Sequence, residues 1–293
     1  KSFTSEQLNN WANEKWKTKT NQSFTLEFRV VAEFAGGKTF EAPEVRTVNV
    51  HVNPIRIEVF EADNMFVAGS AVGGDQIEMT KTAENQSQFA WVGDLVAGEL
   101  QIPVELDGDT YYIIPTDGEG TLMDGEPEAV KMQENPISWN IPADGEYRVV
   151  VNMEKATISI YSPDKALQPR IVEWGTFSVT VTEFWLHGNK NSWGTPVKGN
   201  FKPSLADPQV LVYSGEPLSG WDRVKFIVTN ESPNGAYAFS CVLNAGAARD
   251  ESLSTGVAAD LSEGSSTAQR NSYFKLPTGT NFIVIDLRNM KIL

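Results

Sequence analysis

The chain has 293 residues, of which 41% are hydrophobic and 10% aromatic, and its formal net charge is −14. This composition is normal for a chain that buries a core, and the length allows two domains or a little more. The acidity argues against nucleic-acid binding and against docking on an anionic membrane surface, since both need clustered Lys and Arg. No stretch approaches the roughly 20 apolar residues of a membrane span.

The first 54 residues combine one predicted helix with two predicted strands. Residues 1–20 favour a partly buried surface helix, because Thr4 and Gln7 form a capping-box pattern. Residues 23–32 and 45–52 alternate apolar and polar side chains, which is typical of half-buried strands. Two strands cannot stand alone, so we expect the closing part of a small antiparallel sandwich. Because residue 1 is lysine, we also expect earlier residues to have been removed.

Two longer segments, residues 55–163 and 164–293, repeat one pattern at a spacing of more than a hundred residues. A repeat of this length indicates whole domains rather than solenoid units. We therefore expect both segments to share one strand order. The paired landmarks are Pro142 with Pro277, Tyr147 with Phe282, residues 65–69 with 184–188, and residues 92–99 with 213–221.

The two repeats consist of short predicted strands between Gly, Pro, Asn and Asp turns, with almost no helical periodicity. This pattern predicts an all-β chain of tandem antiparallel β-sandwich modules. Residues 244–271 differ, since they are rich in Ala, Ser and Gly. We expect a long surface loop there, with one helical turn near residues 257–261, which could shape a binding surface.

Residues with catalytic potential form no recognisable motif. The single cysteine, Cys241, lies in an apolar run, and we expect an inert core thiol. The two histidines, His51 and His187, have no metal-ligand spacing. The acidic turns at residues 107–109 and 117–126 could hold calcium through several oxygens, or they are plain solvated turns. We predict no catalytic residue, no cofactor and no enzymatic activity.

The eight tryptophans exceed what the cores require, which leaves candidates for exposed sugar platforms. Aromatic faces stack on the C–H patches of sugars, and nearby amide and cationic groups orient the hydroxyls. Trp193 is the best candidate, because it lies in a polar loop directly after a strand. Trp221 lies in a turn, where platform and core are equally open. The other candidate sugar contacts are Asn191, Lys190 and Asn230 in the second repeat, and Tyr111, Tyr112 and Trp91 in the first repeat, where Gly74 takes the place of Trp193.

Several motifs carry a resemblance to a known family. Residues 93–99 read Gly-Asp-Leu-Val-Ala-Gly-Glu, residues 145–151 read Gly-Glu-Tyr-Arg-Val-Val-Val, and residues 156–160 read Ala-Thr-Ile-Ser-Ile. Together with a strand, a glycine and a Trp-bearing loop, this order resembles the carbohydrate-binding modules of the SusE/SusF family. These are outer-membrane starch-binding lipoproteins of gut Bacteroidetes. Residues 1–54 resemble the end of the family's N-terminal immunoglobulin-like domain.

The resemblance implies part of an immunoglobulin-like domain followed by two carbohydrate-binding-type β-sandwich modules. It further implies a non-catalytic, surface-exposed lipoprotein of a Sus-type uptake system that binds starch or a similar α-glucan. Its lipid anchor is absent from this chain, and its partners would be a TonB-dependent importer and a companion surface lipoprotein. The alternative is a structural or protein-contact lipoprotein whose modules act as spacers without binding glycan. A glycoside hydrolase is a third hypothesis.

Overall fold

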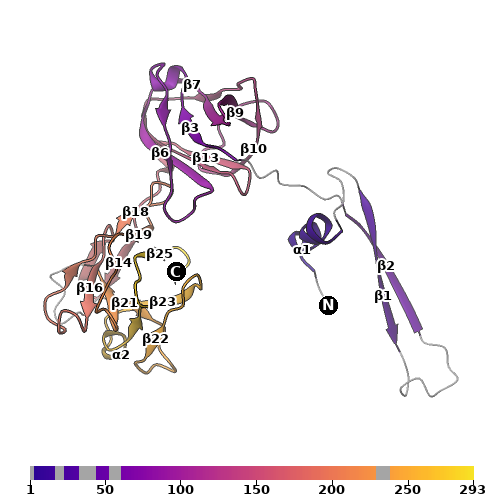
Figure 1. The fold of residues 1–293 in the computed structure, drawn as a ribbon. Coiled ribbons are helices and arrows are strands. Elements are labelled where there is room, and N and C mark those ends of the chain that lie inside the picture. Colours follow the sequence, from indigo (N-terminus) through magenta and orange to yellow (C-terminus); the bar gives the residue numbers. More distant parts are fainter. Residues whose placement is uncertain (1–2, 17–22, 33–43, 53–60, 229–237) are drawn as a thin grey trace. The chain divides into compact units, whose positions relative to one another are not determined.

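The computed structural model of the chain describes residues 3–16, 23–32, 44–52, 61–228 and 238–293 (Figure 1). The chain divides into two compact units, Lys1–Glu58 and Val59–Leu293. Almost all regular structure is antiparallel β, which confirms the predicted all-β class. Among the residues described, no helix is both long enough and apolar enough to cross a membrane.

The first unit begins with helix α1 (Ser5–Asn10), which continues into a π-helical turn, η1 (Trp11–Lys15). The Thr4 hydroxyl accepts from the backbone N–H of Gln7, and the Gln7 side chain accepts from the backbone N–H of Thr4, both at 3.1 Å. The predicted capping box is therefore confirmed. The α-helix is shorter than the predicted range of 1–20, part of which lies outside the described residues.

Strands β1 (Phe24–Ala32) and β2 (Glu44–Val52) pair antiparallel in the same unit. On β1, half-buried Phe24 and Phe28 alternate with exposed polar residues, as predicted, but Val30 on the same predicted face is 67% exposed. The prediction of a half-buried apolar face is wrong for β2 at Val48, which is 60% exposed. The described residues of the chain leave that part of the pair uncovered. The immunoglobulin-like origin of this unit stays a prediction.

The first module, defined here as residues 64–161, folds its strands around one core in which Trp139 and Tyr147 are fully buried. The Trp139 indole N–H donates to the Glu128 carboxylate at 2.8 Å. A separate pair joins β7 (Gly98–Leu100) to β11 (Trp139–Ile141), and a 3-10 turn, η3, covers Ser70–Val72. The main sheet runs β4 (Ile77–Glu78), β3 (Asn64–Val67), β8 (Ile102–Leu106), β9 (Asp109–Pro115), β10 (Glu128–Gln133), β13 (Thr157–Tyr161), β12 (Gly145–Asn152), β6 (Gln88–Leu95) and β5 (Thr80–Lys81).

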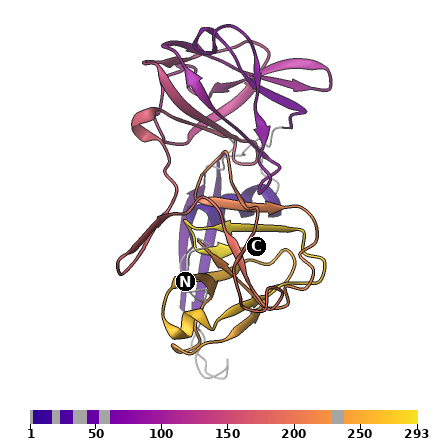
Figure 2. The same ribbon diagram turned by 90° about the vertical axis from the view of Figure 1, so that its left-hand side faces the viewer.

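The second module, defined here as residues 171–292, follows the short turn η4 (Pro163–Lys165) (Figures 1 and 2). It has its own hydrophobic core. Its main path runs β17 (Val197–Lys198), β16 (Trp185–Gly188), β20 (Val224–Ile227), β21 (Ala238–Cys241), β23 (Ala259–Gly264), β26 (Lys291–Ile292), β25 (Phe282–Asp286), β19 (Val210–Ser214) and β18 (Lys202–Pro203). Three further elements are the hairpin β14 (Ile171–Trp174) with β15 (Phe177–Thr180), the short helix α2 (Thr267–Arg270), and β24 (Tyr273–Lys275), which pairs with β20 and with β22 (Asp250–Ser252).

The strand order of the second module matches that of the first module position by position, which confirms the expectation of one shared strand order. Two glycines show how closely the backbones correspond. A Cβ on Gly69 would lie 2.3 Å from the Glu99 carbonyl oxygen, and a Cβ on Gly188 would lie 1.9 Å from the Arg223 carbonyl oxygen. Each site therefore requires glycine, and Glu99 corresponds to Arg223.

One predicted pairing is wrong by a single residue. Asn152 and Asp286 occupy the same position in equivalent hairpins, since Asn152 pairs with Thr157 and Asp286 pairs with Lys291. This register aligns Arg148, rather than Tyr147, with Phe282. Because successive strand residues point to opposite faces, Tyr147 is buried whereas Phe282 is 39% exposed.

The prediction of a long loop with a helical turn near residues 257–261 is also wrong. Residues 244–271 contain strands β22 and β23 and the short helix α2. The residues predicted to be helical lie largely in β23, which pairs with β21. Small polar residues form strands here because the edges of β21 and β24 supply hydrogen-bonding partners, a tertiary effect that overrides local propensity.

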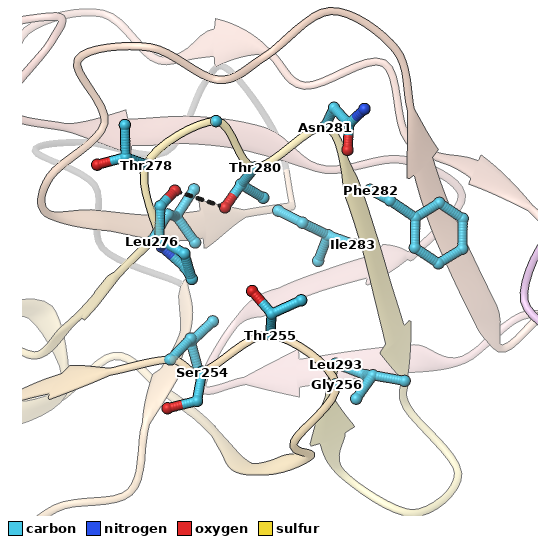
Figure 3. A pocket seen from close by; sticks show the side chains of 13 residues that line it. Ser254, Thr255, Gly256, Leu276, Thr278, Thr280, Asn281, Phe282, Ile283 and Leu293 are labelled. Atoms are coloured by element: carbon cyan, nitrogen blue, oxygen red, sulfur yellow. Dashed lines mark hydrogen bonds between the residues drawn. The ribbon is translucent and has the colours of Figure 1, made fainter.

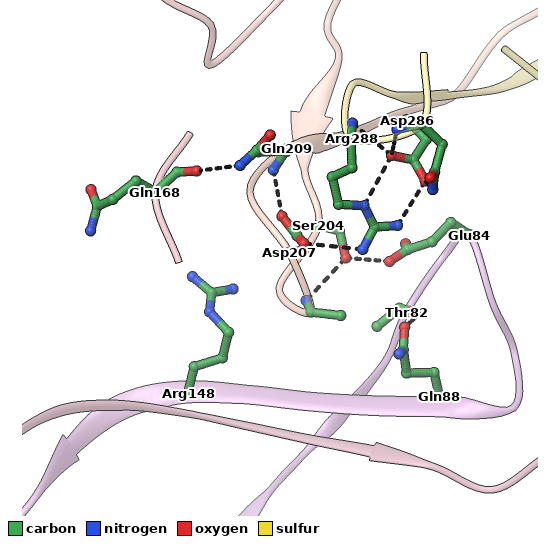
Figure 4. A network of polar contacts seen from close by, with 12 residues as sticks. Thr82, Glu84, Gln88, Arg148, Gln168, Ser204, Asp207, Gln209, Asp286 and Arg288 are labelled. Carbon is green, nitrogen blue, oxygen red and sulfur yellow. Dashed lines mark hydrogen bonds and ion pairs between the residues drawn. The ribbon is translucent and has the colours of Figure 1, made fainter. Parts of the chain in front are cut away.

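A small junction connects the two modules (Figure 4). The Ser204 hydroxyl of the second module bonds to Glu84 of the first, and Arg148 donates to the Leu205 carbonyl. Beside these polar contacts, Ala206 packs with Val150 of the first module. The loop that makes these contacts is braced within its own module, since Asp207 pairs with Arg288 and accepts from the backbone N–H of Gln209. The predicted domain limits, 1–54, 55–163 and 164–293, stay predictions.

Candidate functional site

The second module contains a cavity of about 520 Å³. Five segments supply its wall: the end of β16, the loop that follows it, the residue before β20, α2 with the residue after it, and β24. A cavity of this size can hold a small organic group, and its aromatic and polar lining is typical of ligand sites. The lining residues are His187, Trp193, Arg223, Thr267, Arg270, Asn271 and Tyr273.

The loop 189–194 places Trp193 in the lining of this cavity. Ser192 and Trp193 have φ angles of 52° and 59°, a left-handed conformation that is uncommon for residues other than glycine. The Asn191 side chain fixes the loop, since it accepts from the Gly188 N–H at 3.0 Å and donates to the Thr195 carbonyl at 2.7 Å. The loop thereby presents the Trp193 ring with 37% of the residue exposed.

The aromatic part of the site is a pair of rings. The centroids of Trp193 and Tyr273 lie 4.6 Å apart, and their planes meet at 53°. The Arg223 guanidinium lies 4.7 Å from the Tyr273 ring centroid and 5.6 Å from that of Trp193, which is cation–π range. Trp193 thus contacts Tyr273 and, edge-on at 5.8 Å, His187, while the residue stays partly exposed.

The charged part of the site is cationic. Arg223 donates from Nη2 to Asp250 at 2.9 Å, while its buried Nε has no partner within the described part of the chain. Lys225 is 1% exposed and donates from Nζ to the Arg270 carbonyl at 2.6 Å. Burial, followed by repulsion from Arg270, lowers the pKa of Lys225 to about 8. Lys225 thus still carries its charge at neutral pH.

His187 forms the inner wall and is 3% exposed. Burial, followed by the charge of Lys225, lowers its pKa to about 4, so the imidazole is neutral at pH 7. Its Nδ1 atom is buried without a hydrogen-bond partner among the described residues. A buried polar atom of this kind is costly unless something else satisfies it.

The sequence-predicted sugar contacts have different positions in the structure. Trp221 is 4% exposed and belongs to the core of the second module. Of the two alternatives left open, the core position is therefore the one found, and Trp221 as a sugar contact is wrong. Lys190 lies with its Nζ 6.0 Å above the Trp221 ring and does not line the cavity. Asn191 uses its amide to hold the loop, and Asn230 lies outside the described residues.

The candidates in the first module contribute no comparable site. Tyr111 packs against the core and Tyr112 is half-buried on β9. Trp91 is 8% exposed and belongs to the core. These positions give no exposed aromatic platform beside a cavity like that of Trp193.

The loop that bears Trp193 has an equivalent in the first module. There, Gly74 donates its N–H to the Gly69 carbonyl at 3.1 Å, just as Trp193 donates to the Gly188 carbonyl at 3.0 Å. The preceding residue is Gly73, so two glycines adopt the left-handed conformation that Ser192 and Trp193 adopt in the second module. Trp193 therefore occupies a position that glycine suits better conformationally.

Strand register identifies the other equivalents. Ala68 pairs with Gln101 as His187 pairs with Lys225, and Trp139 pairs with Leu100 as Phe274 pairs with Val224. The sequence-based match of Trp221 with the Glu99 region is therefore shifted, since Glu99 corresponds to Arg223. In order, His187, Trp193, Arg223, Lys225 and Tyr273 correspond to Ala68, Gly74, Glu99, Gln101 and Ser138.

A second cavity of about 300 Å³ lies between residues 253–256 and the turn that precedes β25 (Figure 3). In this view Phe282 lies on the opposite side of β25 from Ile283, and Thr280 donates to the Pro277 carbonyl at 2.7 Å. Its lining carries no charged side chain. It therefore offers fewer groups for ligand recognition than the Trp193 cavity.

Within the described ranges, no group of three or more His, Cys, Asp or Glu side chains could hold a metal ion. Cys241 is fully buried, and its thiol contacts the carbonyls of Arg249 and Tyr273. Burial raises the pKa of Cys241, which makes it a poor nucleophile. This agrees with the predicted inert thiol.

Sequence reasoning missed the residues that complete the cavity. Tyr273, Arg223 and Arg270 are far apart in the chain, and only the fold brings them to Trp193. One available signal was that Tyr273 directly precedes Phe274, the counterpart of Trp139. A second was that Arg223 follows the turn at Trp221 as Glu99 follows the turn before Leu100.

Comparisons with known proteins add little. No family model matches the chain, and no curated protein matches it. A search of solved structures finds SusF from Bacteroides thetaiotaomicron, with 12% sequence identity and a TM-score of 0.29. The match covers 95% of this chain and 58% of SusF, so the chain spans less than two thirds of that structure.

Proposed function

We propose that this chain is a non-catalytic glycan-binding protein whose main site is the Trp193 cavity. The observation that carries the proposal is the partly exposed Trp193 ring, tilted against Tyr273 over a cavity with guanidinium and amide donors. An aromatic face covers the C–H patch of a sugar, and surrounding donors bind its hydroxyls. The lining of the Trp193 cavity contains both the aromatic face and the hydrogen-bond donors.

The conformation of Trp193 adds support. A bulky residue in the left-handed region carries strain on the order of 1–3 kcal/mol, and such strain clusters at functional sites. The first module makes the same turn with Gly73 and Gly74. The fold therefore does not need tryptophan there, and a ligand gives a reason for it.

The cavity lacks the groups that hydrolysis requires. Glycosidases use two carboxylates that flank the scissile bond. The lining of this cavity includes no Asp or Glu, and the neighbouring Asp250 is paired with Arg223 and Lys275. Binding without cleavage is the chemistry that these residues support.

The cellular setting rests on the resemblance to the SusE/SusF family. On that basis the protein is a surface-exposed outer-membrane lipoprotein of a Sus-type uptake system, working beside a TonB-dependent importer and a companion lipoprotein. Starch and similar α-glucans are the ligand class that the resemblance implies. The alternative, a spacer without glycan binding, predicts no ligand for either module.

Isothermal titration of the chain against α-glucans, β-glucans, mannans and acidic polysaccharides tests the proposal. We expect at least one class to bind, with one binding site per chain, because only the second module has the cavity residues. Absence of binding to every class would favour the spacer. Two equal sites per chain would contradict the assignment to the second module.

A further inference from the structure

The Trp193 cavity has a charge opposite to that of the chain. The protein carries a net charge of −14, yet the cavity lining includes two arginines and no carboxylate. A third cation, Lys225, lies next to the cavity residue Tyr273, with its Nζ 5.4 Å from the Tyr273 ring centroid. The site therefore concentrates positive charge on a protein whose overall field is negative.

Of the two arginines that line the cavity, Arg270 is the one without a carboxylate partner among the described residues. It lies at the end of α2 and is half-buried, and its side chain has no ion-pair partner in the described portion of the chain. Its backbone carbonyl accepts from Lys225, which fixes the residue at the cavity. A half-buried guanidinium without a carboxylate partner has donors available for a planar anion.

Arg223 and His187 add further unused hydrogen-bonding capacity. Arg223 is partly neutralised by Asp250, but its buried Nε has no partner among described residues. His187 lines the cavity and is 3% exposed, and its Nδ1 atom has no hydrogen-bond partner among the residues that the structure describes. Both side chains line the cavity, where Arg223 adds a second guanidinium beside Arg270.

The first module shows that the fold does not require these cations. Glu99 corresponds to Arg223, and Gln101 corresponds to Lys225. The neutral Ser138 corresponds to Tyr273 and accepts from Gln101 at 3.0 Å. The same backbone thus supports a negative residue where the second module has a positive one, so the charge of the second module is a property of its site.

We propose that the glycan bound in the Trp193 cavity carries an acidic group, a sugar carboxylate or a sulfate ester, which is held by Arg270 and Arg223. This inference rests on the proposed glycan-binding function, and it replaces the neutral α-glucans that the family resemblance implies with an acidic glycan. Arg270 supplies the open cation, and Arg223 sits above the ring pair. The sugar ring stacks on the exposed face of Trp193.

Titration calorimetry with matched glycans tests this inference. The probes are polygalacturonate and its methyl ester, which differ in the charge of the carboxyl group, together with alginate, chondroitin sulfate and neutral pullulan. We expect an acidic probe to bind at least about tenfold more tightly than neutral probes. Because the chain itself is strongly acidic, non-specific attraction cannot produce this preference.

Arg270→Gln tests the contact itself. Removing one charge-assisted hydrogen bond is expected to weaken binding of the acidic probe about tenfold to a hundredfold. Binding of neutral probes should weaken by a clearly smaller factor, because a guanidinium binds an anionic oxygen more strongly than a hydroxyl. The matched control is Lys198→Gln, which removes an exposed cation on β17 outside the cavity and is expected to leave affinity unchanged. The Arg270 side chain has no structural partner among described residues, so the variant should fold normally.

The outcomes separate this inference from the proposed function. Neutral glycans that bind through Trp193 as tightly as acidic ones would overturn the inference and leave the function intact. An acidic probe whose affinity is unaffected by Arg270→Gln would also overturn it. A panel in which no probe binds would remove the proposed function and this inference together.

Discussion

Replacement of Trp193 separates its binding role from its structural role. Since an aromatic side chain carries roughly 150–250 Å² of buriable area and Trp193 is 37% exposed, a sugar ring can cover roughly 60–90 Å² of it. At about 25 cal/mol per Å² this contact contributes roughly 1.5–2.3 kcal/mol. We therefore expect Trp193→Ala to weaken glycan binding about tenfold to fiftyfold.

Trp193→Gly provides the conformational comparison. Glycine adopts the left-handed conformation without a Cβ penalty, whereas alanine retains a penalty of roughly 1–2 kcal/mol. The glycine variant should therefore be about 1 kcal/mol more stable than the alanine variant in urea unfolding, and equally weak in binding. The first module already has glycine, Gly74, at the equivalent left-handed position.

The matched control is Phe282→Ala. Phe282 is 39% exposed in the same module but lies outside the Trp193 cavity. We expect it to leave affinity unchanged in the same titration. Equal losses for Phe282→Ala and Trp193→Ala, or full binding by a folded Trp193→Ala protein, would refute the stacking argument.

Three further predictions concern backbone packing, pH and catalysis. Gly188→Ala should lower the free energy of unfolding by about 2 kcal/mol or more, because its Cβ would lie 1.9 Å from the Arg223 carbonyl oxygen; Gly215→Ala, whose nearest contact is the Tyr213 hydroxyl at 3.3 Å, should cost much less in the same urea titration. His187 has a folded pKa of about 4, so between about pH 6.5 and pH 4 only the unfolded chain binds a proton at this residue. The free energy of unfolding should therefore fall by on the order of 3 kcal/mol as the pH is lowered through this range. In His187→Gln the free energy of unfolding should depend less steeply on pH. Incubation with any bound glycan should release no reducing ends above a heat-inactivated control, and release at a measurable rate would contradict the non-catalytic assignment.

Features governed by local patterns were predictable from sequence. The capping box at Thr4 follows from two side chains three residues apart. The shared strand order follows from landmarks that recur with similar spacing. The exposure of Trp193 follows from its polar loop directly after a strand. The first and third features depend on neighbouring residues along the chain, and the second depends on comparing the two repeats.

Features governed by distant contacts were not predictable in the same way. The turn that contains Trp221 left a platform and a core position equally open, and only the fold shows that Trp221 packs into the core of the second module. Residues 250–252 read as loop, yet they form a strand because β24 supplies a parallel partner. Arg270 and Tyr273 reach Trp193 only through the arrangement of α2 and β24. A one-residue slip between Tyr147 and Phe282 was enough to exchange a buried face for an exposed one.

A crystal structure of the chain with a bound oligosaccharide is the most direct test of the glycan site. We predict one sugar stacked on the exposed face of Trp193, with a polar substituent within hydrogen-bonding distance of Arg270 or Arg223. A sugar bound beside Phe282 in the smaller cavity, or bound only to the first module, would contradict the assignment of the Trp193 cavity as the binding site.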